Sequence, residues 1–391
     1  MQHGAAAVTP LRGTIARLPA SRIREVANAG LGRHDVLAFW FGESDEVTAP
    51  AVREAAARSL TEGETFYAHN LGLPELREAI ARYMSNLHGR IDAQRIAVTS
   101  GGVNALMVAM QALVDPGDEV VAVVPVWPNL TAQPQILGAQ VRRVPLVVRD
   151  ARWALDLDAV ITAVTPRTRV LLLNAPGNPT GWTLSRDEQR TLLAHCRSTG
   201  TWIVADEVYE RLYFGGTCAP SFLDIADPQD RLLVAHSFSK SFLMTGWRLG
   251  WLVCPAEVTP DIGKLIEFNT SCAPVFVQRG ALVALDDAAD TVPKLVRHLQ
   301  ACRDCLIRDL QRLPRVEVAP PPAGMYAFLR VHEEPDSMAL AKRLVAEVGL
   351  GLAPGVAFGS EGEGWLRWCF ASRELDRLSR GVQRLSTALT A

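Results

Sequence analysis

The sequence predicts an α/β protein with a large domain, built on a mostly parallel seven-stranded sheet sandwiched by helices, and a smaller α+β domain. Between residues 95 and 255, short runs rich in Val, Leu and Ile alternate with amphipathic segments. Strands that are buried on both faces of a parallel sheet have this nearly continuous apolar character. The chain has 391 residues, which is too long for one ordinary core and suits a large domain with a second, smaller one.

Seven apolar runs are expected to form the strands of the large sheet: residues 95–99, 119–124, 141–147, 169–174, 201–205, 232–236 and 249–254. Helices are expected between several of them, for example over residues 103–114 and 186–198. The second helix has a clear start signal, because Ser185 can cap it while Glu188 completes the capping box.

The pattern changes after about residue 290. The expected elements are now a long helix, two strands, a helix, a strand and a final helix, over residues 292–313, 316–319, 325–331, 338–348, 365–371 and 375–388. This α+β order predicts a second domain, and residues 1–45 are expected to return and pack against it. We therefore expect a large domain over residues 46–285 and a small domain formed by residues 1–45 and 286–391.

The composition favours a small-molecule ligand. Hydrophobic residues make up 48% of the chain and charged residues 21%, and the formal net charge is −2. Acidic and basic residues are interspersed, so neither a nucleic acid nor an anionic membrane surface is an expected partner. The N-terminal residues lack the features of a secretory signal, and no apolar run is long enough to span a bilayer, so we expect a cytoplasmic protein.

The seven cysteines are odd in number and scattered, as buried thiols of a reducing compartment are. Cys302 and Cys305 form a C-x-x-C pair within the long predicted helix. No second pair accompanies them to complete a metal site, so we interpret the pair as a coincidence on a helix face. No metal site is predicted.

The segment from Ser237 to Gly250 carries the strongest chemical signal. It follows an apolar strand and contains several hydroxyl side chains, with Lys240 and, eight residues later, Arg248. A lysine that forms a Schiff base must lose its proton, which a partly dry site at a strand end favours. Hydroxyl groups and a bidentate arginine are suitable ligands for a phosphate. The chain has only four lysines, Lys240, Lys264, Lys294 and Lys342, and the last three lie in helix-like contexts that predict solvent-exposed side chains.

Two further strand ends carry polar side chains. Asn178 lies in the Pro- and Gly-rich turn of residues 174–181, at the edge where α/β sheets place their ligands. Asp206 follows another apolar strand, where an unpaired carboxylate is costly to bury. A protonated pyridine nitrogen would be a suitable partner for Asp206, and Tyr209 could reach the phenolic oxygen of the same ring. A helix cap or an arginine partner for Asp206 is an equally open interpretation of that residue alone.

Two weaker signals lie upstream. The glycines before Val103 form a strand–turn–helix junction, and the free amides of such a helix start, including that of Gly102, bind anions. Many strand–helix turns contain glycines, so this signal is not specific. Trp127 follows another strand, where its indole could stack on a flat ring or simply belong to the core.

Taken together, these segments resemble the class I/II aminotransferases of pyridoxal phosphate (PLP) fold type I, over nearly the whole chain. The patterns N-x-P-x-N-P-T-G, D-E-x-Y and S-x-S-K-x-x-x-x-x-G-W-R-x-G occur in this order, and residues 41–44, 65–68 and 72–77 also match the family. The likeness is strongest to bacterial aspartate aminotransferases of the prokaryotic subgroup. The resemblance implies a transferase of amino-acid metabolism with PLP as its cofactor.

The resemblance also implies roles for individual residues. Lys240 would carry PLP as a Schiff base and move a proton at the substrate α-carbon. Asp206 would hold the pyridine nitrogen, Tyr209 and Asn178 would contact the ring oxygen, and Trp127 would stack on the ring. The implied ligands of the phosphate are Ser237, Ser239, Arg248 and the amides of Gly102 and Val103.

For the substrate, the resemblance implies that Arg367 binds the α-carboxylate through two hydrogen bonds and that the backbone of Gly42 lies against the same group. Trp127 and Asn178 would contact the substrate as well. Tyr67 resembles the tyrosine that reaches the phosphate of a neighbouring subunit, which implies a homodimer with shared active sites.

The substrate is less determined than the cofactor. Val103 stands where aspartate-selective members of the subgroup can carry a lysine that recognises the distal carboxylate, so aspartate, neutral and aromatic donors are all open. The expected reaction is a ping-pong transfer of the amino group of an L-amino acid to a 2-oxo acid such as 2-oxoglutarate. The same constellation serves PLP-dependent carbon–sulfur β-lyases, which remain the alternative. A regulator that only senses PLP is not expected, because too few residues precede the first family motif for a DNA-binding domain.

Overall fold

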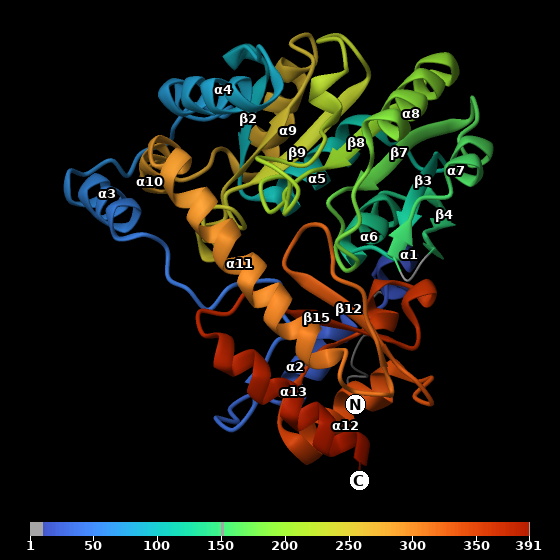
Figure 1. The fold of residues 1–391 in the computed structure, drawn as a ribbon. Helices are drawn as coiled ribbons and strands as arrows, with labels where there is room; N and C mark the ends of the chain where they lie inside the picture. The colour runs from blue at the N-terminus through green and yellow to red at the C-terminus, as the bar shows by residue number, and fades with distance from the viewer. Residues whose placement is uncertain (1–10, 150–151, 391) are drawn as a thin grey trace, which may run out of the picture.

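The computed structural model describes residues 11–149 and 152–390. Two sheets dominate it, and Figure 1 shows the larger one with its helices above the smaller one. Residues 1–10, which the predicted small domain includes, lie outside the described residues. The predicted domain boundaries at residues 45 and 285 stay a prediction.

The larger sheet has seven strands, in the order β2-β10-β9-β8-β7-β3-β4. Their bounds are Ile96–Thr99 (β2), Glu119–Val124 (β3), Gln140–Pro145 (β4), Thr168–Asn174 (β7), Trp202–Asp206 (β8), Leu232–Ser237 (β9) and Gly250–Val253 (β10). β10 runs antiparallel to both of its neighbours, and the other pairs are parallel. The mostly parallel seven-stranded sheet is therefore confirmed. The run predicted over 141–147 is divided between β4 and the short hairpin of β5 (Val147–Arg149) and β6 (Arg152–Ala154).

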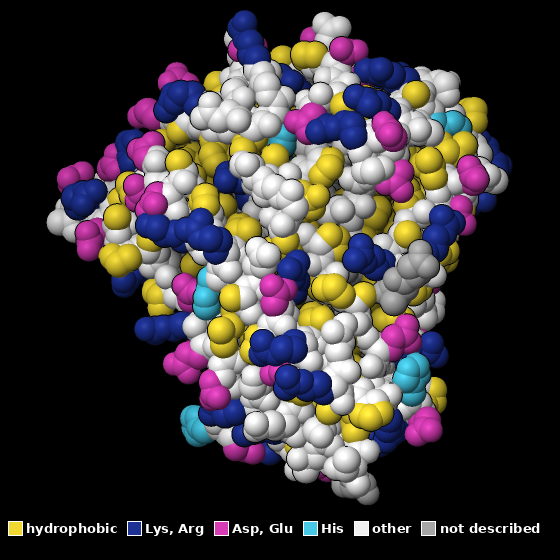
Figure 2. All heavy atoms as spheres, viewed as in Figure 1, with side chains coloured by type: hydrophobic (Ala, Val, Ile, Leu, Met, Phe, Trp, Pro, Cys, Tyr) yellow, Lys and Arg dark blue, Asp and Glu magenta, His cyan; other side chains and the backbone are white. Residues whose placement is uncertain are grey.

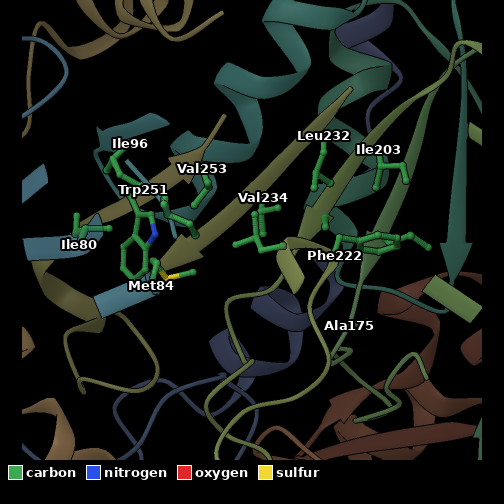
Figure 3. Packing of buried hydrophobic residues seen from close by; sticks show 14 of the residues in the cluster. Ile80, Met84, Ile96, Ala175, Ile203, Phe222, Leu232, Val234, Trp251 and Val253 are labelled. Atoms are coloured by element: carbon green, nitrogen blue, oxygen red, sulfur yellow. The ribbon is translucent and has the colours of Figure 1, made fainter. Parts of the chain in front are cut away.

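Successive strand residues alternate between the two faces of this sheet, as the pleat requires. On one face, Val120, Leu172 and Leu233 belong to a core that also contains residues of α5, α6 and α9. The other face packs against α4, α7, α8 and α10. Figure 3 shows Trp251 of this face beside Ile80 and Met84 of α4. Helices thus cover both faces, and the ends of the strands are left to form the site.

The helices of this layer are α3 (Pro50–Thr61), α4 (Pro74–His88), α5 (Gly102–Leu113), α6 (Pro128–Ile136), α7 (Leu157–Ala163), α8 (Arg186–Thr199), α9 (Thr259–Thr270) and α10 (Val275–Asp286). The capping box predicted for α8 is confirmed, because the Ser185 side chain accepts from the Glu188 amide and the Glu188 carboxylate accepts from the Ser185 amide. No helix of the described residues combines the length and the apolar character that crossing a membrane requires.

The smaller sheet has the order β11-β12-β15-β14 and is antiparallel. Its strands are Val316–Glu317 (β11), Tyr326–Val331 (β12), Ala353–Pro354 (β14) and Trp365–Cys369 (β15). The helices α2 (Arg22–Ala29), α11 (Ala288–Leu310), α12 (Ser337–Val348) and α13 (Leu375–Thr390) contribute to its core. Figure 1 shows the long α11 extending from the upper layer to the lower one.

The N-terminal segment contacts both layers. β1 (Leu37–Ala38) pairs with β13 (Leu350–Gly351), and α2 packs against α12. Arg12, just before α1 (Gly13–Ala16), instead donates to the Ile136 carbonyl at the end of α6. The N-terminal segment therefore crosses the boundary between the layers, where the site lies.

On the face that Figure 2 shows, acidic and basic side chains are interspersed and form no single basic patch.

Candidate active site

A cavity of about 460 Å³ lies where the carboxyl ends of β7, β8 and β9 approach β12 and β15 of the smaller sheet. It collects twelve of the residues predicted from the sequence: Gly42, Gly102, Val103, Trp127, Asn178, Asp206, Tyr209, Ser237, Ser239, Lys240, Arg248 and Arg367. Tyr67 is not among its lining residues, and its side chain is 88% exposed. The structure of one chain therefore brings the predicted site together except for Tyr67.

Lys240 lies in the loop after β9, with its amine deep in the cavity. Nζ donates a hydrogen bond of 2.5 Å to the Gly42 carbonyl and lies 5.6 Å from the centre of the Tyr209 ring. The Lys240 side chain is accessible from the cavity. The protein atoms around it nevertheless desolvate its ammonium form, which lowers the pKa of Lys240 to about 8. A larger fraction of the amine is therefore neutral near pH 7 than in a solvated lysine, and only the neutral amine attacks a carbonyl.

Asp206 ends β8 and is buried. Its carboxylate accepts a long hydrogen bond of 3.4 Å from the Val208 amide. No basic side chain of the described residues lies within 4.0 Å of it. Burial consequently raises the pKa of Asp206 to about 7. A carboxyl group in this state needs a protonated nitrogen to stabilise its charge.

Groups that can donate hydrogen bonds to an anion surround the start of α5. Gly101 has a φ of 96°, and a Cβ on it would lie 2.5 Å from Nη2 of Arg248, so the turn needs glycine here. Nη1 of Arg248 donates to the Ser239 hydroxyl at 3.3 Å and to the Thr245 carbonyl at 2.7 Å. The guanidinium, the hydroxyls and the amides of a helix N-terminus are the donor set that a phosphate requires.

Arg367 lies in the middle of β15 and is 2% exposed. Nη1 donates to Oδ1 of Asn178 at 2.9 Å, and Nη2 donates to the Trp40 carbonyl. Nε is buried and has no hydrogen-bond partner among the residues that the structure describes. No carboxylate of residues 11–149 or 152–390 lies within salt-bridge distance of the guanidinium. A buried cation without an anionic partner is costly, so this arrangement is suited to binding a carboxylate ligand.

Tyr326 completes the wall between Gly42 and Tyr209. Its hydroxyl lies 2.7 Å from the Tyr209 hydroxyl, and both side chains are buried. A Cβ on Gly42 would overlap the Tyr326 hydroxyl, so only glycine fits at residue 42. The Tyr326 ring also lies 4.5 Å from the Arg367 guanidinium carbon.

Several lining residues were not predicted from the sequence: Ile23, Arg24, Phe41, Glu43, Leu106, Asn174, Val208, Thr245 and Tyr326. Thr245 and Asn174 lie inside motifs that were recognised, and their polar side chains are signals that could have identified them. Tyr326 has the same sequence context as a core aromatic residue of a strand. Arg24 has the context of a surface helix, so its position depends on how the N-terminal segment packs.

These groups fit PLP, the cofactor that the sequence predicts. Lys240 supplies an amine for the aldehyde of PLP, and Asp206 supplies a carboxylate for its ring nitrogen. Arg248, Ser239 and the amides at the start of α5 supply hydrogen-bond donors for its phosphate. The fit rests on the partly desolvated Lys240 amine and on the absence of a cation within 4.0 Å of the buried Asp206 among the described residues. The three features lie in one cavity.

Comparison with known proteins gives the same assignment. Residues 36–385 match the model of the family described as aminotransferase class I and II. The chain is 33% identical over 369 residues to a probable aspartate/prephenate aminotransferase of Aquifex aeolicus, covering 91% of each chain. Its fold matches that of the aspartate aminotransferase from Thermotoga maritima with a TM-score of 0.90 and 30% identity, covering 97% of this chain and all of the other.

A second solved structure differs in the substrate that its name gives. The N-succinyldiaminopimelate aminotransferase of Mycobacterium tuberculosis matches with a TM-score of 0.91 and 28% identity, covering 97% of this chain and 100% of the other. Enzymes with different amino donors thus share this fold, so the comparisons identify the family but not the amino donor. The chain belongs to the class I and II aminotransferases, which are PLP-dependent enzymes that transfer amino groups between amino acids and 2-oxo acids.

Proposed function

We propose that this enzyme moves the amino group of an L-amino acid to 2-oxoglutarate by a ping-pong mechanism, in which both substrates use the same cavity in turn. The observation that carries the proposal is the buried Arg367, which shares a cavity with Lys240 and has no acidic partner among the described residues. Amino acids and 2-oxo acids share an α-carboxylate, so one arginine can orient both substrates.

Residues at the carboxyl ends of five strands, β2, β3, β7, β8 and β9, would hold the cofactor. When bound, PLP accepts the amino group and withdraws electrons from the substrate α-carbon. Asp206 would keep the ring nitrogen protonated, because the ion pair offsets the cost of burying its carboxylate. Tyr209 and Asn178 would contact the ring oxygen, and Trp127 would stack on the ring. The phosphate ligands would be Ser237, Ser239, Arg248 and the amides of Gly102 and Val103.

Lys240 would have two tasks. Its neutral amine would hold the cofactor, and Nζ would take and return the proton at the substrate α-carbon. A general base works best when its pKa lies near the working pH, and burial brings the pKa of Lys240 to about 8. Arg367, with the Gly42 backbone close to it, would hold the α-carboxylate so that the α-carbon faces Nζ.

We propose that the enzyme is a homodimer with shared active sites. Phe66, Tyr67 and Phe268 are large apolar side chains that are each more than four-fifths exposed in the single chain. The Asn70 side chain donates a hydrogen bond of 3.0 Å to the Gly263 carbonyl, so the loop that carries Phe66 and Tyr67 is fastened to α9, which carries Phe268. Tyr67 would then reach the cofactor phosphate of the neighbouring subunit.

Sedimentation of the purified protein tests the dimer. The wild type should sediment as a dimer, and Phe268→Glu should shift it toward monomers because a charge replaces an apolar contact. Glu257→Gln, a change before the same helix, is the control. A wild-type monomer that retains full activity would contradict the shared active site.

A half-reaction screen tests the transfer itself. Holoenzyme is mixed with single amino acids, and conversion of the cofactor from its aldehyde to its amine form is recorded by absorbance. We expect conversion by at least one amino acid, reversal by 2-oxoglutarate, and parallel lines in double-reciprocal plots. An enzyme that no amino acid converts would contradict the proposal. Release of pyruvate and ammonia from cysteine conjugates without a 2-oxo acid would instead establish a β-lyase.

A further inference from the structure

Tyr326 is a lining residue of the cavity whose polar group has no task in the proposed function. It begins β12 of the smaller sheet, where its backbone pairs with Cys369 of β15. Tyr209, by contrast, follows β8 of the larger sheet. The two side chains nevertheless meet at the cavity, with their hydroxyl oxygens 2.7 Å apart. This contact joins the smaller sheet to a residue that the proposed function assigns to the cofactor.

The Tyr326 hydroxyl is held in place from three sides. Its ring meets the Tyr209 ring edge to face, with the ring centres 5.6 Å apart and the planes at 79°. The guanidinium carbon of Arg367 lies 4.5 Å from the centre of the Tyr326 ring. Gly42 lies so close to the hydroxyl that a Cβ there would overlap it. Because the side chain is buried and enclosed in this way, its hydroxyl has no room to move away from Tyr209.

The two hydroxyls together carry one proton more than their contact uses. Burial raises the pKa of both Tyr209 and Tyr326, so both are neutral O–H groups near pH 7. A phenol hydroxyl donates one hydrogen bond and can also accept. Among residues 11–149 and 152–390, neither hydroxyl has another hydrogen-bond partner. One O–H is therefore left over at the cavity wall, and a buried donor of this kind needs an acceptor, which a ligand in the cavity can supply.

We propose that Tyr326 is a positioning residue for the cofactor: its hydroxyl donates to Tyr209, so that the Tyr209 proton points to the ring oxygen of PLP. This role rests on the proposed function, which assigns Tyr209 to that oxygen, and it adds the group that orients Tyr209. In the opposite arrangement Tyr209 would donate to Tyr326, and the ring oxygen would lose this donor. The orientation of one proton thus decides whether Tyr209 can act on the cofactor.

The hydrogen bond to the ring oxygen has a measurable consequence. The lysine-bound cofactor can carry a proton on the nitrogen that Lys240 supplies, beside the ring oxygen. Loss of this proton leaves the negative charge of the ring oxygen without its neighbouring cation, so a donor to that oxygen stabilises the deprotonated form. A hydroxyl that accepts a hydrogen bond donates more strongly. Tyr326 therefore lowers the pH at which the bound cofactor loses its proton.

Other titratable groups also lie around the two tyrosines. They are Asp206, Lys240, Arg367 and Cys369. A change of Tyr326 to phenylalanine leaves all four in place, so a shift of the cofactor titration in that variant reports the missing hydroxyl.

The test is an absorbance titration of the holoenzyme with pH, which requires bound cofactor but no turnover. Tyr326→Phe removes the hydroxyl and keeps the ring, and it should raise the midpoint by about 0.3–1 pH unit, because part of one hydrogen bond is lost. Tyr209→Phe should raise the midpoint further. The double variant Tyr209→Phe/Tyr326→Phe should have the midpoint of Tyr209→Phe, because Tyr326 acts only through Tyr209. Tyr213→Phe, in the same loop as Tyr209 but outside the cavity lining, is the control and should leave the midpoint unchanged.

Three results would overturn the positioning role. One is an unchanged midpoint in Tyr326→Phe while Tyr209→Phe shifts it. Another is a double variant in which the two shifts add, which would show that Tyr326 acts on the cofactor without Tyr209. The third is an unchanged midpoint in Tyr209→Phe as well, which would refute the assignment of Tyr209 to the ring oxygen. The half-reaction screen is independent of these: a holoenzyme that no amino acid converts, but whose midpoint responds as expected, would contradict amino-group transfer and leave the role of Tyr326 in place.

Discussion

The Oδ1 atom of Asn178 accepts a hydrogen bond of 2.9 Å from Nη1 of Arg367, and this bond joins the two layers of the molecule across the cavity. The backbone N–H of Asn178 donates to Oδ1 of Asn174 at 2.8 Å. The side-chain Nδ2 of Asn174 donates to the backbone carbonyl of Asp206 at 3.1 Å. The residue that would bind the substrate carboxylate is thus connected to the strand end that would bind the cofactor ring. The orientation of the Arg367 guanidinium therefore depends on the position of the strand end that carries Asp206, and the reverse also holds.

Asn178→Ala should weaken substrate binding more than catalysis. It removes a hydrogen bond to a charged group, which contributes roughly 1.5–3 kcal/mol, so KM for the amino acid should rise about tenfold or more. Steady-state kinetics with saturating 2-oxo acid measure the effect. Asn86→Ala, which changes an exposed asparagine, is the control. A fall in kcat at unchanged KM would show that Asn178 does not orient the carboxylate site.

Much of the fold could be predicted because its signal is local. Seven apolar runs predicted seven strands, since burial on both faces makes each strand apolar throughout. The spatial order and the reversed direction of β10 could not be predicted in this way, because an apolar strand reads the same in either direction. Strand order depends on pairings between distant residues.

The residues of the candidate site also fall into those that a local sequence pattern predicts and those that it does not. Asp206 ends a strand, and Lys240 and Asn178 lie in the loops just after strands, so their sequence context predicted that they meet at one edge of the sheet. Tyr326 and Arg24 come from elements outside that sheet, and they reach the cavity only through the packing of the second layer and the N-terminal helix. No local pattern carries that information.

Gly42→Ala should impair the enzyme, and removal of the Tyr326 hydroxyl should restore part of the loss. The added methyl group would overlap the hydroxyl, and overpacking of this kind costs about 1–3 kcal/mol. The double variant Gly42→Ala/Tyr326→Phe should therefore lose less kcat/KM than the two single losses combined. At Gly216, a Cβ would meet its nearest neighbour at 3.8 Å, so Gly216→Ala is the control. Strictly additive losses would contradict this packing.

The neutral fraction of Lys240 should rise through pH 8 in the apoenzyme. Burial lowers the pKa of Lys240 to about 8, so acylation of Nζ should accelerate up to that pH and then level off, as the neutral amine is the reactive form. Competitive labelling with acetic anhydride followed by mass spectrometry measures it, with the exposed Lys264 as internal reference for the reagent. A rate that still rises tenfold per pH unit above pH 9 would contradict the desolvated amine.

A charge network surrounds the buried His88. The two ring nitrogens of His88 lie 2.9 Å from a carboxylate oxygen of Glu210 and 2.8 Å from one of Asp224. Burial alone would lower the pKa of His88, but these two carboxylates raise it to about 11. The folded chain therefore keeps a proton on His88 at pH values where the unfolded chain has released it. The contribution to stability is complete below about pH 6.5 and is lost as the pH rises toward 11.

His88→Gln should lower the free energy of unfolding by about 3–5 kcal/mol at pH 7, because it removes the hydrogen-bonded cation of the buried Glu210. Urea denaturation at pH 7 and pH 9 measures the loss, with the exposed His34→Gln as control. Since only the wild type loses the His88 contribution with rising pH, the difference between the two proteins should shrink by up to about 1.4 kcal/mol per pH unit. A difference that stays constant from pH 7 to pH 9 would mean that His88 is neutral in the folded chain and acts through hydrogen bonding alone.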